Sequence, residues 1–155
     1  MKNISTLVVI VFLLQACAST KNIHTDVLPS EVEAKVKFDM SLDDFKKLKG
    51  TSASETEANN FRTIYTERVS EERVSGFAYY FSTEGEKPLY EIIIIYKDEN
   101  ERDIDAERLF GEPNVDGEEW FIERKPHDLK AWKYRNKLII TALIPGTEWY
   151  KDAYD

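Results

Sequence analysis

Two histidines are the first side chains to consider for catalysis, because histidine can transfer protons at neutral pH. His127 directly precedes Asp128, and a histidine oriented by an aspartate is half of the arrangement that activates a serine in hydrolases. Neighbours in sequence do not by themselves adopt that geometry, and residues 125–128 (Lys-Pro-His-Asp) have the composition of a turn. The other histidine, His24, lies in a polar segment. We therefore expect no catalytic residue in this chain.

The acidic run at residues 97–105 is the next candidate, because alternating oxygen ligands bind calcium in EF-hand loops. Asp98, Asn100 and Asp103 provide oxygens, but the central glycine that such a loop needs is missing. Acidic residues also favour the first turn of a helix, where they lie at the positive end of the helix dipole. We predict a helix N-terminus here, with no metal and no cofactor.

Composition limits the classes of partner. The chain has 155 residues, with 21 Lys+Arg against 29 Asp+Glu and a formal net charge of −8. Nucleic-acid binding uses clustered basic residues, so we predict no nucleic-acid partner. Because 42% of the residues are apolar and 12% aromatic, the chain has enough apolar surface to fold, and its length suits one domain.

The N-terminus predicts an exported protein. Lys2 precedes an unbroken apolar run at residues 7–14, which is far shorter than the roughly 20 residues of a membrane-spanning helix. A short basic region followed by a short apolar region is typical of a signal peptide, which we place at residues 1–16. Cys17 follows it and is the only cysteine, so an internal disulfide is excluded.

The residues Leu14, Gln15, Ala16 and Cys17 resemble the lipobox of bacterial lipoproteins. The resemblance implies cleavage before Cys17 and lipidation of Cys17, which would anchor the protein in the membrane. Ala18 stands where an aspartate favours retention in the inner membrane, so the resemblance implies the outer membrane, with the protein facing the periplasm. The alternative is an ordinary signal peptide with Cys17 as a free thiol. Residues 17–36 are polar and are predicted to form a tether.

Two short helices are marked by their ends. Ser41 is a candidate N-cap that pairs with Asp44, and Gly50 is the expected stop of the first helix. The second helix follows the acidic run and ends at Gly111, where Pro113 prevents continuation.

After each helix the apolar period changes to that of strands. The predicted strands are residues 61–69, 74–82, 89–97, 119–124, 129–135 and 138–144. Their order predicts an α+β domain at residues 37–146, in which short helices pack on one face of the sheet. It would consist of two tandem units, each a helix plus three antiparallel strands, at about 38–97 and 100–145. Residues 147–155 form an acidic and aromatic tail.

Residues 40–50 and 104–113, the latter ending in Leu-Phe-Gly-Glu-Pro, resemble the BamE/SmpA-like group of outer-membrane lipoproteins and the related β-lactamase-inhibitor-protein-like repeats. The resemblance implies a binding or assembly-supporting role rather than catalysis. No functional residue is transferred from it.

Aromatic residues point to a binding surface, because Tyr and Trp are enriched at protein interfaces. Aromatic side chains fall on both sides of the predicted strands, so one set belongs to the core and the other is available for a partner. Glu91 suggests which side of its strand faces water. The candidate partner-binding residues are Tyr80, Ile93, Ile95 and Trp132. Alternatively the tether or the tail, with Trp149, covers this face, or the assignment of faces is off by one residue.

Three hypotheses follow for function. The leading one is a non-enzymatic, lipid-anchored envelope protein that binds a protein partner, in envelope assembly or maintenance. The second is an acidic inhibitor or immunity-type protein that fits the basic cleft of an enzyme or toxin. The third, a small hydrolase or ligand-binding domain, needs a deep pocket with convergent polar groups, for which the sequence offers no constellation.

Overall fold

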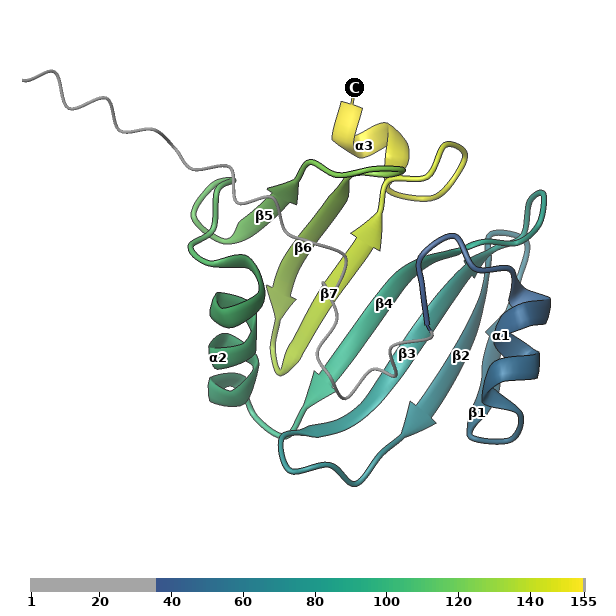
Figure 1. Ribbon diagram of the computed structural model, residues 1–155, viewed down its shortest axis with the longest axis horizontal. Coiled ribbons are helices and arrows are strands. Elements are labelled where there is room, and N and C mark those ends of the chain that lie inside the picture. Colours follow the sequence, from purple (N-terminus) through teal and green to yellow (C-terminus); the bar gives the residue numbers. More distant parts are fainter. Residues whose placement is uncertain (1–35, 155) are drawn as a thin grey trace, which may run out of the picture.

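The computed structural model describes residues 36–154, which form a seven-stranded antiparallel sheet with three short helices. The predicted α+β class is confirmed. The predicted signal peptide, Cys17 and His24 lie outside the described residues. In chain order the elements are α1 (Leu42–Lys49), β1 (Ala53–Ala58), β2 (Arg62–Arg68), β3 (Val74–Ser82), β4 (Leu89–Tyr96), α2 (Glu99–Phe110), β5 (Glu119–Ile122), β6 (Leu129–Tyr134), β7 (Lys137–Ala142) and α3 (Tyr150–Tyr154) (Figure 1).

The strand order across the sheet is β1-β2-β3-β4-β7-β6-β5, and every neighbouring pair is antiparallel. The central strand β4 carries the run Ile92–Ile95, which is apolar on both sides. A strand with two apolar faces is stable only where both faces are covered by other groups. The position of β4 in the middle of the sheet follows from that pattern.

One strand was not expected from the sequence. Strand β1 has the sequence ASETEA, and five of its six residues are exposed. It lacks the alternation of apolar and polar residues that identifies a half-buried strand, and it forms through pairing with β2 at the edge of the sheet. The first half of the domain therefore has four strands after its helix, where three were predicted.

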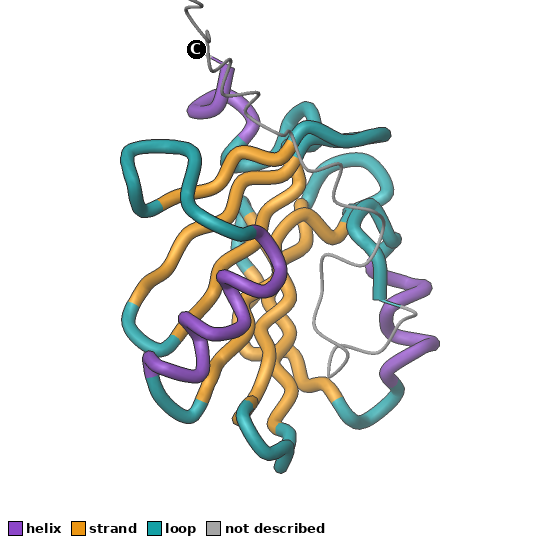
Figure 2. The backbone as a smooth tube through the Cα atoms, turned by 60° about the vertical axis from the view of Figure 1, so that its left-hand side comes forward, coloured by secondary structure: helices purple, strands orange, loops and turns teal. Residues whose placement is uncertain are grey.

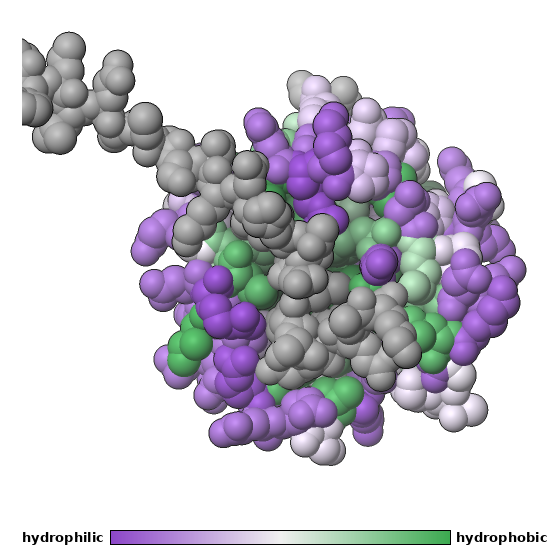
Figure 3. Space-filling view, in the orientation of Figure 1, coloured by the Kyte–Doolittle hydropathy of each residue, from purple (hydrophilic) through white to green (hydrophobic). Residues whose placement is uncertain are grey.

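Helices α1 and α2 pack on the same side of the sheet, which we call the helix face and which carries Ile92 and Ile94 of β4. Phe45 of α1 is fully buried, with ring centroids 4.8 Å from Tyr79 and 4.9 Å from Phe81. On this face the two helices lie toward opposite edges of the sheet, α1 near β1 and α2 near β5 (Figures 1 and 2). Hydrophilic side chains predominate over both helices in the space-filling view (Figure 3), as expected for amphipathic helices.

Both helices begin at an acidic or hydroxyl cap. The Ser41 hydroxyl accepts a hydrogen bond from the backbone N–H of Asp44 at 3.2 Å, as predicted. Asp98 caps α2 by accepting from the backbone N–H of Glu101 at 2.9 Å. The acidic run at residues 97–105 is thus the N-terminal part of a helix, and residues 36–154 hold no cluster of side chains suited to a metal ion. Gly50 and Gly111 end the helices with positive φ angles, which glycine adopts without strain.

Asp105, in the same acidic run, anchors α2 to the sheet. Its side chain is fully buried. The carboxylate accepts hydrogen bonds from Arg73 at 2.6 Å, from the Tyr96 hydroxyl at 3.1 Å and from Arg108 at 3.2 Å. A buried charge is tolerated when it is paired and hydrogen-bonded in this way.

The ends of the described chain take part in packing. Val36, the last residue of the predicted tether, is buried in the helix-face core. In the predicted tail, Thr147 is buried and α3 follows it. Within residues 36–154, none of the helices combines the length and apolar character that crossing a membrane requires.

Candidate functional site: the second face of the sheet

The candidate partner-binding residues come together on the side of the sheet opposite the helices, which we call the second face. Register places Ala78, Ile93, Ile139 and Trp132 in one row across β3, β4, β7 and β6. Tyr80 lies beside this row on β3, two residues along the strand from Ala78 and on the same side of the sheet.

We define the second-face cluster by its apolar members. Four of them, each between 6% and 8% exposed, are Ile64, Ala78, Ile93 and Ile139, and the half-buried residues packed against them are Tyr80, Ile95 and Trp132. All the predicted partner-binding residues belong to this cluster. Sequence reasoning missed Ile64, Ala78 and Ile139, because their membership depends on which strands are neighbours.

Helices α1 and α2 contribute no side chain to the second-face cluster. Their buried apolar residues belong to the helix-face core. Long side chains shield the cluster instead: the Lys130 ammonium lies 5.8 Å from the centre of the Trp132 ring. The face is therefore apolar in its middle, with tyrosine and tryptophan rings at its borders, which is the composition of many protein interfaces.

Glu91 corrects one expectation about this face. It was expected to face water, yet it is only 4% exposed. The indole N–H of Trp149, from the segment between β7 and α3, donates a hydrogen bond to its carboxylate. The Trp149 ring also packs on Trp132, with centroids 5.0 Å apart and planes at 69°. The alternative in which the tail covers this face therefore holds for the end of the face where Glu91 lies.

The environment of Glu91 favours its neutral form. Burial, and to a smaller extent the nearby negative charge of Glu148, raise the pKa of this carboxyl group, which lies at about 7. The hydrogen bond from Trp149 and the positive charge of Arg62 act in the opposite direction. Carboxyl groups with strongly shifted pKa values cluster at functional sites, which makes this end of the face a candidate site.

Glu148 makes a second attachment beside Glu91. Its carboxylate accepts a hydrogen bond from the Tyr90 hydroxyl at 3.0 Å and pairs with the Arg62 guanidinium at 3.3 Å. Arg62 also lies over the Tyr80 ring, 5.2 Å from its centre. Burial and the charges of Glu148 and Glu91 raise the pKa of the Tyr90 hydroxyl, so this group stays protonated and acts as a donor.

Helix α3 is attached to the domain more loosely than Glu148 and Trp149 are. None of its residues is buried. The Tyr154 hydroxyl donates to Asp128 at 2.6 Å, and its ring meets Phe121 edge-on at 6.4 Å. The hydrogen bond to Asp128 raises the pKa of Tyr154 to about 12.

The His127–Asp128 pair does not form the geometry of a hydrolase. Asp128 accepts from the backbone N–H of Arg124 on one oxygen and from Tyr154 on the other. His127 is half-buried, with Nε2 at 3.5 Å from the Asp39 carboxylate. These contacts organise a turn, as the composition of the segment predicted.

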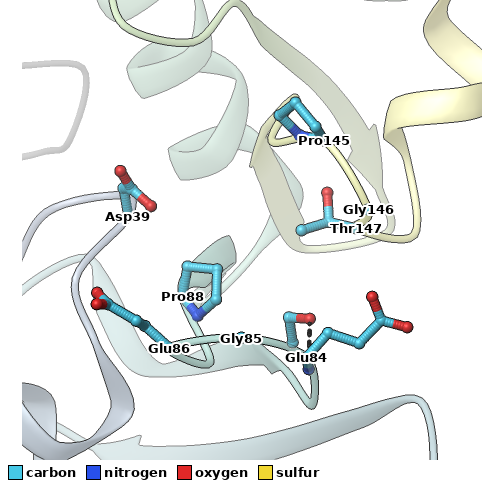
Figure 4. A pocket seen from close by; sticks show the side chains of 9 residues that line it. Asp39, Glu84, Gly85, Glu86, Pro88, Pro145, Gly146 and Thr147 are labelled. Atoms are coloured by element: carbon cyan, nitrogen blue, oxygen red, sulfur yellow. Dashed lines mark hydrogen bonds between the residues drawn. The ribbon is translucent and has the colours of Figure 1, made fainter.

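A separate hollow of about 350 Å³ lies between the β3–β4 turn and the loop after β7 (Figure 4). Its lining includes the acidic residues Asp39, Glu84 and Glu86, together with Pro88 and Pro145. The carboxylates would suit a positively charged group from a partner.

Comparisons with protein-family models, curated protein sequences and solved structures found no match for this chain.

Proposed function

We propose that this chain is a non-enzymatic lipoprotein of the bacterial outer membrane that binds a protein partner in the periplasm through its second face. Its role would be in envelope assembly or maintenance. Residues 1–16 would be the signal peptide and Cys17 the lipidated residue, with residues 17–36 linking the lipid to the domain. Several acyl chains on one residue give stable anchoring, whereas one chain binds a membrane only weakly.

The second-face cluster is the observation that supports a binding role. Residues from separate strands form one apolar row on a face to which α1 and α2 add no side chain. Trp132 ends this row and Tyr80 lies beside it, and both are half-buried, so parts of both rings remain accessible. Tyrosine and tryptophan are enriched among the residues that contribute most to binding, because they bury large areas while keeping a polar group.

We also infer that the domain derives from two tandem units of a helix and three strands, with β1 added to the first. The order β2-β3-β4 on one side and β5-β6-β7 on the other, with β4 paired to β7 at the centre, supports this inference. Each unit would then supply one helix to the helix face.

A second candidate function is an acidic inhibitor or immunity-type protein. The hollow lined by Asp39, Glu84 and Glu86 favours it, because these carboxylates could receive a basic side chain of an enzyme or toxin. The net charge of −8 would speed association with a basic partner. Binding of this kind weakens strongly as salt increases, which distinguishes it from apolar binding through the second face.

Crosslinking of the lipidated protein in its native envelope, followed by purification, tests the leading proposal. The Tyr80→Ala/Trp132→Ala variant should lose the dominant crosslinked partner. The matched control is Phe61→Ala/Ile104→Ala, which removes two exposed apolar side chains outside the cluster (83% and 49% exposed) and should retain the partner. Circular dichroism confirms that each variant is folded.

Equal recovery of the partner with both variants would overturn the assignment of the second face. Loss of the partner at high salt, together with its retention by the Tyr80→Ala/Trp132→Ala variant, would favour the acidic inhibitor. A Cys17→Ser variant that stays with the membrane fraction would overturn lipid anchoring, independently of the binding face.

A further inference from the structure

Two adjacent residues of the chain, Glu148 and Trp149, occupy a site on the second face. Trp149 provides the aromatic half of the attachment: its ring packs against Trp132, and its indole N–H donates a hydrogen bond to Glu91. Glu91 is followed on the same side of β4 by Ile93, a member of the second-face cluster. A molecule bound to the cluster would therefore reach the groups that hold Trp149.

Glu148 provides the acidic half of the same attachment. The Tyr90 hydroxyl and the Arg62 guanidinium both engage its carboxylate, at 3.0 Å and 3.3 Å. Arg62 is held in place by Glu57 at 3.4 Å and by its stacking over Tyr80. A fixed guanidinium and a phenol hydroxyl together suit a carboxylate ligand.

The stability of the fold alone does not explain why a carboxyl group is buried at Glu91. A carboxylate placed among apolar side chains destabilises a fold unless partners compensate for the lost hydration. Among the described residues, its hydrogen-bond donor is the indole of Trp149, which belongs to a segment whose following helix α3 has no buried residue. The donor that compensates Glu91 is therefore a half-buried residue of the C-terminal segment that lies outside every helix and strand of the described residues, so another molecule can replace it without disturbing the sheet.

We propose that Glu91, Trp132, Arg62 and Tyr90 form an acid–aromatic subsite, which recognises a partner segment carrying an acidic side chain next to an aromatic ring with an N–H or O–H donor. Glu148 and Trp149 are the chain's own occupant of this subsite, and the partner replaces them. The inference rests on the proposed function, since it names the chemistry of the partner that the second face binds.

Each group of the subsite selects against a simpler ligand. A phenylalanine would fill the ring position beside Trp132 but would leave the Glu91 carboxylate buried without a donor, which sites of this kind reject strongly. A lysine would pair with Glu91 but would give no ring to Trp132. A segment without an acidic residue would leave Arg62 paired with Glu57 and without the second carboxylate that it now engages.

A peptide of residues 145–151 provides the test, because it contains Glu148 and Trp149 and lacks Tyr154. The purified full chain carrying Glu148→Ala/Trp149→Ala has an emptied subsite. We expect the peptide to bind this variant at least tenfold more tightly than wild type, measured by fluorescence anisotropy, because in wild type the attached segment competes at high effective concentration.

Matched variants assign the binding to the subsite. Adding Trp132→Ala or Glu91→Ala to the double variant should abolish binding, whereas adding Phe61→Ala should not change it. A peptide with Trp149→Phe should bind at least tenfold more weakly than the parent peptide. In wild type, saturating peptide should shift the one indole N–H resonance that a Trp149→Phe substitution removes, which provides a test should the double variant not fold.

Two results would overturn the subsite. One is that no peptide binds the folded double variant and no indole resonance moves in wild type. The other is that a peptide with Trp149→Lys binds as tightly as the parent, which would make Glu91 a simple site for cations. Neither result bears on capture of an envelope partner by Tyr80 and Trp132, so the proposed function is judged separately by the crosslinking experiment.

Discussion

Two buried carboxylates, one on each face of the sheet, differ in how they are held. Asp105 on the helix face has 0% exposure and receives hydrogen bonds from two arginines and a tyrosine. Glu91 on the second face has 4% exposure and receives a hydrogen bond from the indole of Trp149. The partners of Asp105 come from α2 itself and from the sheet and its adjoining segments, whereas the partner of Glu91 comes from the C-terminal segment.

This difference separates a structural charge from an exchangeable one. The groups around Asp105 lie on α2, on β4 and in the segment between β2 and β3, so its ion pairs fasten α2 to the sheet. The donor to Glu91, Trp149, is half-buried and lies outside every helix and strand of the described residues, so we expect that it can leave without unfolding the sheet. The helix face is therefore built for stability, and we expect the second face to be used for recognition.

Removing the helix-face carboxylate should give the largest loss of stability. An Asp105→Ala substitution leaves Arg73 and the Tyr96 hydroxyl without the acceptor they now share, and breaking a buried ion pair typically costs about 3–5 kcal/mol. Urea unfolding followed by circular dichroism measures the change. Asp103→Ala is the matched control: its side chain is 49% exposed, so a loss below about 1 kcal/mol is expected. Equal losses for the two variants would contradict the anchoring role of Asp105.

The second-face carboxylate should instead make stability depend on pH. Burial raises the pKa of Glu91 from 4.5 to about 7, so the folded state holds this proton more tightly than the unfolded state. Its contribution to the free energy of unfolding is therefore fully present below pH 4.5 and is lost as the pH rises to about 7. One pKa unit corresponds to about 1.4 kcal/mol, so we expect a loss on the order of 3 kcal/mol across this range.

A Glu91→Gln substitution provides the control for the pH dependence. Glutamine has nearly the same shape and does not titrate, so the variant should lose the decline in stability between pH 5 and pH 7 and should be more stable than wild type at pH 8. Urea unfolding at several pH values measures both effects. An unchanged pH profile in the variant would show that another group causes the decline.

The contrast between these carboxylates also shows what sequence patterns can predict. The apolar pattern predicted the strands β2 to β7 within one or two residues at their ends, because each of these strands buries at least one face and shows either alternation or, in β4, a continuous apolar run. Strand β1 was missed because its pairing with β2, rather than a buried face, holds it in place. Ser41, Gly50 and Gly111 were predicted correctly, since caps and stops depend on local geometry alone.

The candidate site was only partly predictable from the sequence, because contacts between residues that are far apart along the chain leave no local pattern. Tyr80, Ile93, Ile95 and Trp132 could be assigned to one face from their period within each strand. The burial of Glu91 could not, because its partner Trp149 is 58 residues away in sequence. Likewise, the carboxylate of Asp105 looked like any acidic residue near a helix N-terminus, although Arg73 lies 32 residues before it.

Comparing a tryptophan on each face should sharpen the distinction between a face built for stability and a face used for recognition. Trp132→Ala on the second face removes a half-buried ring, and we expect a loss of about 1–2 kcal/mol. Trp120 on the helix face is 3% exposed, packs on Phe110 and donates to the Gly111 carbonyl, so Trp120→Ala should cost more, about 3–5 kcal/mol. Urea unfolding ranks the two variants. The reverse ranking would mean that the second face also serves chiefly for stability.

The smallest effect should come from the outermost attachment of the C-terminal segment. Tyr154→Phe removes the hydrogen bond to Asp128, and because this bond is exposed we expect a loss of about 0.5 kcal/mol in urea unfolding. Binding of the peptide of residues 145–151 should not change, because Glu148 and Trp149, not α3, would keep the subsite occupied. Tighter peptide binding by Tyr154→Phe would show that α3 holds Glu148 and Trp149 in place. The part of the chain that must detach before the peptide can bind would then extend to Tyr154.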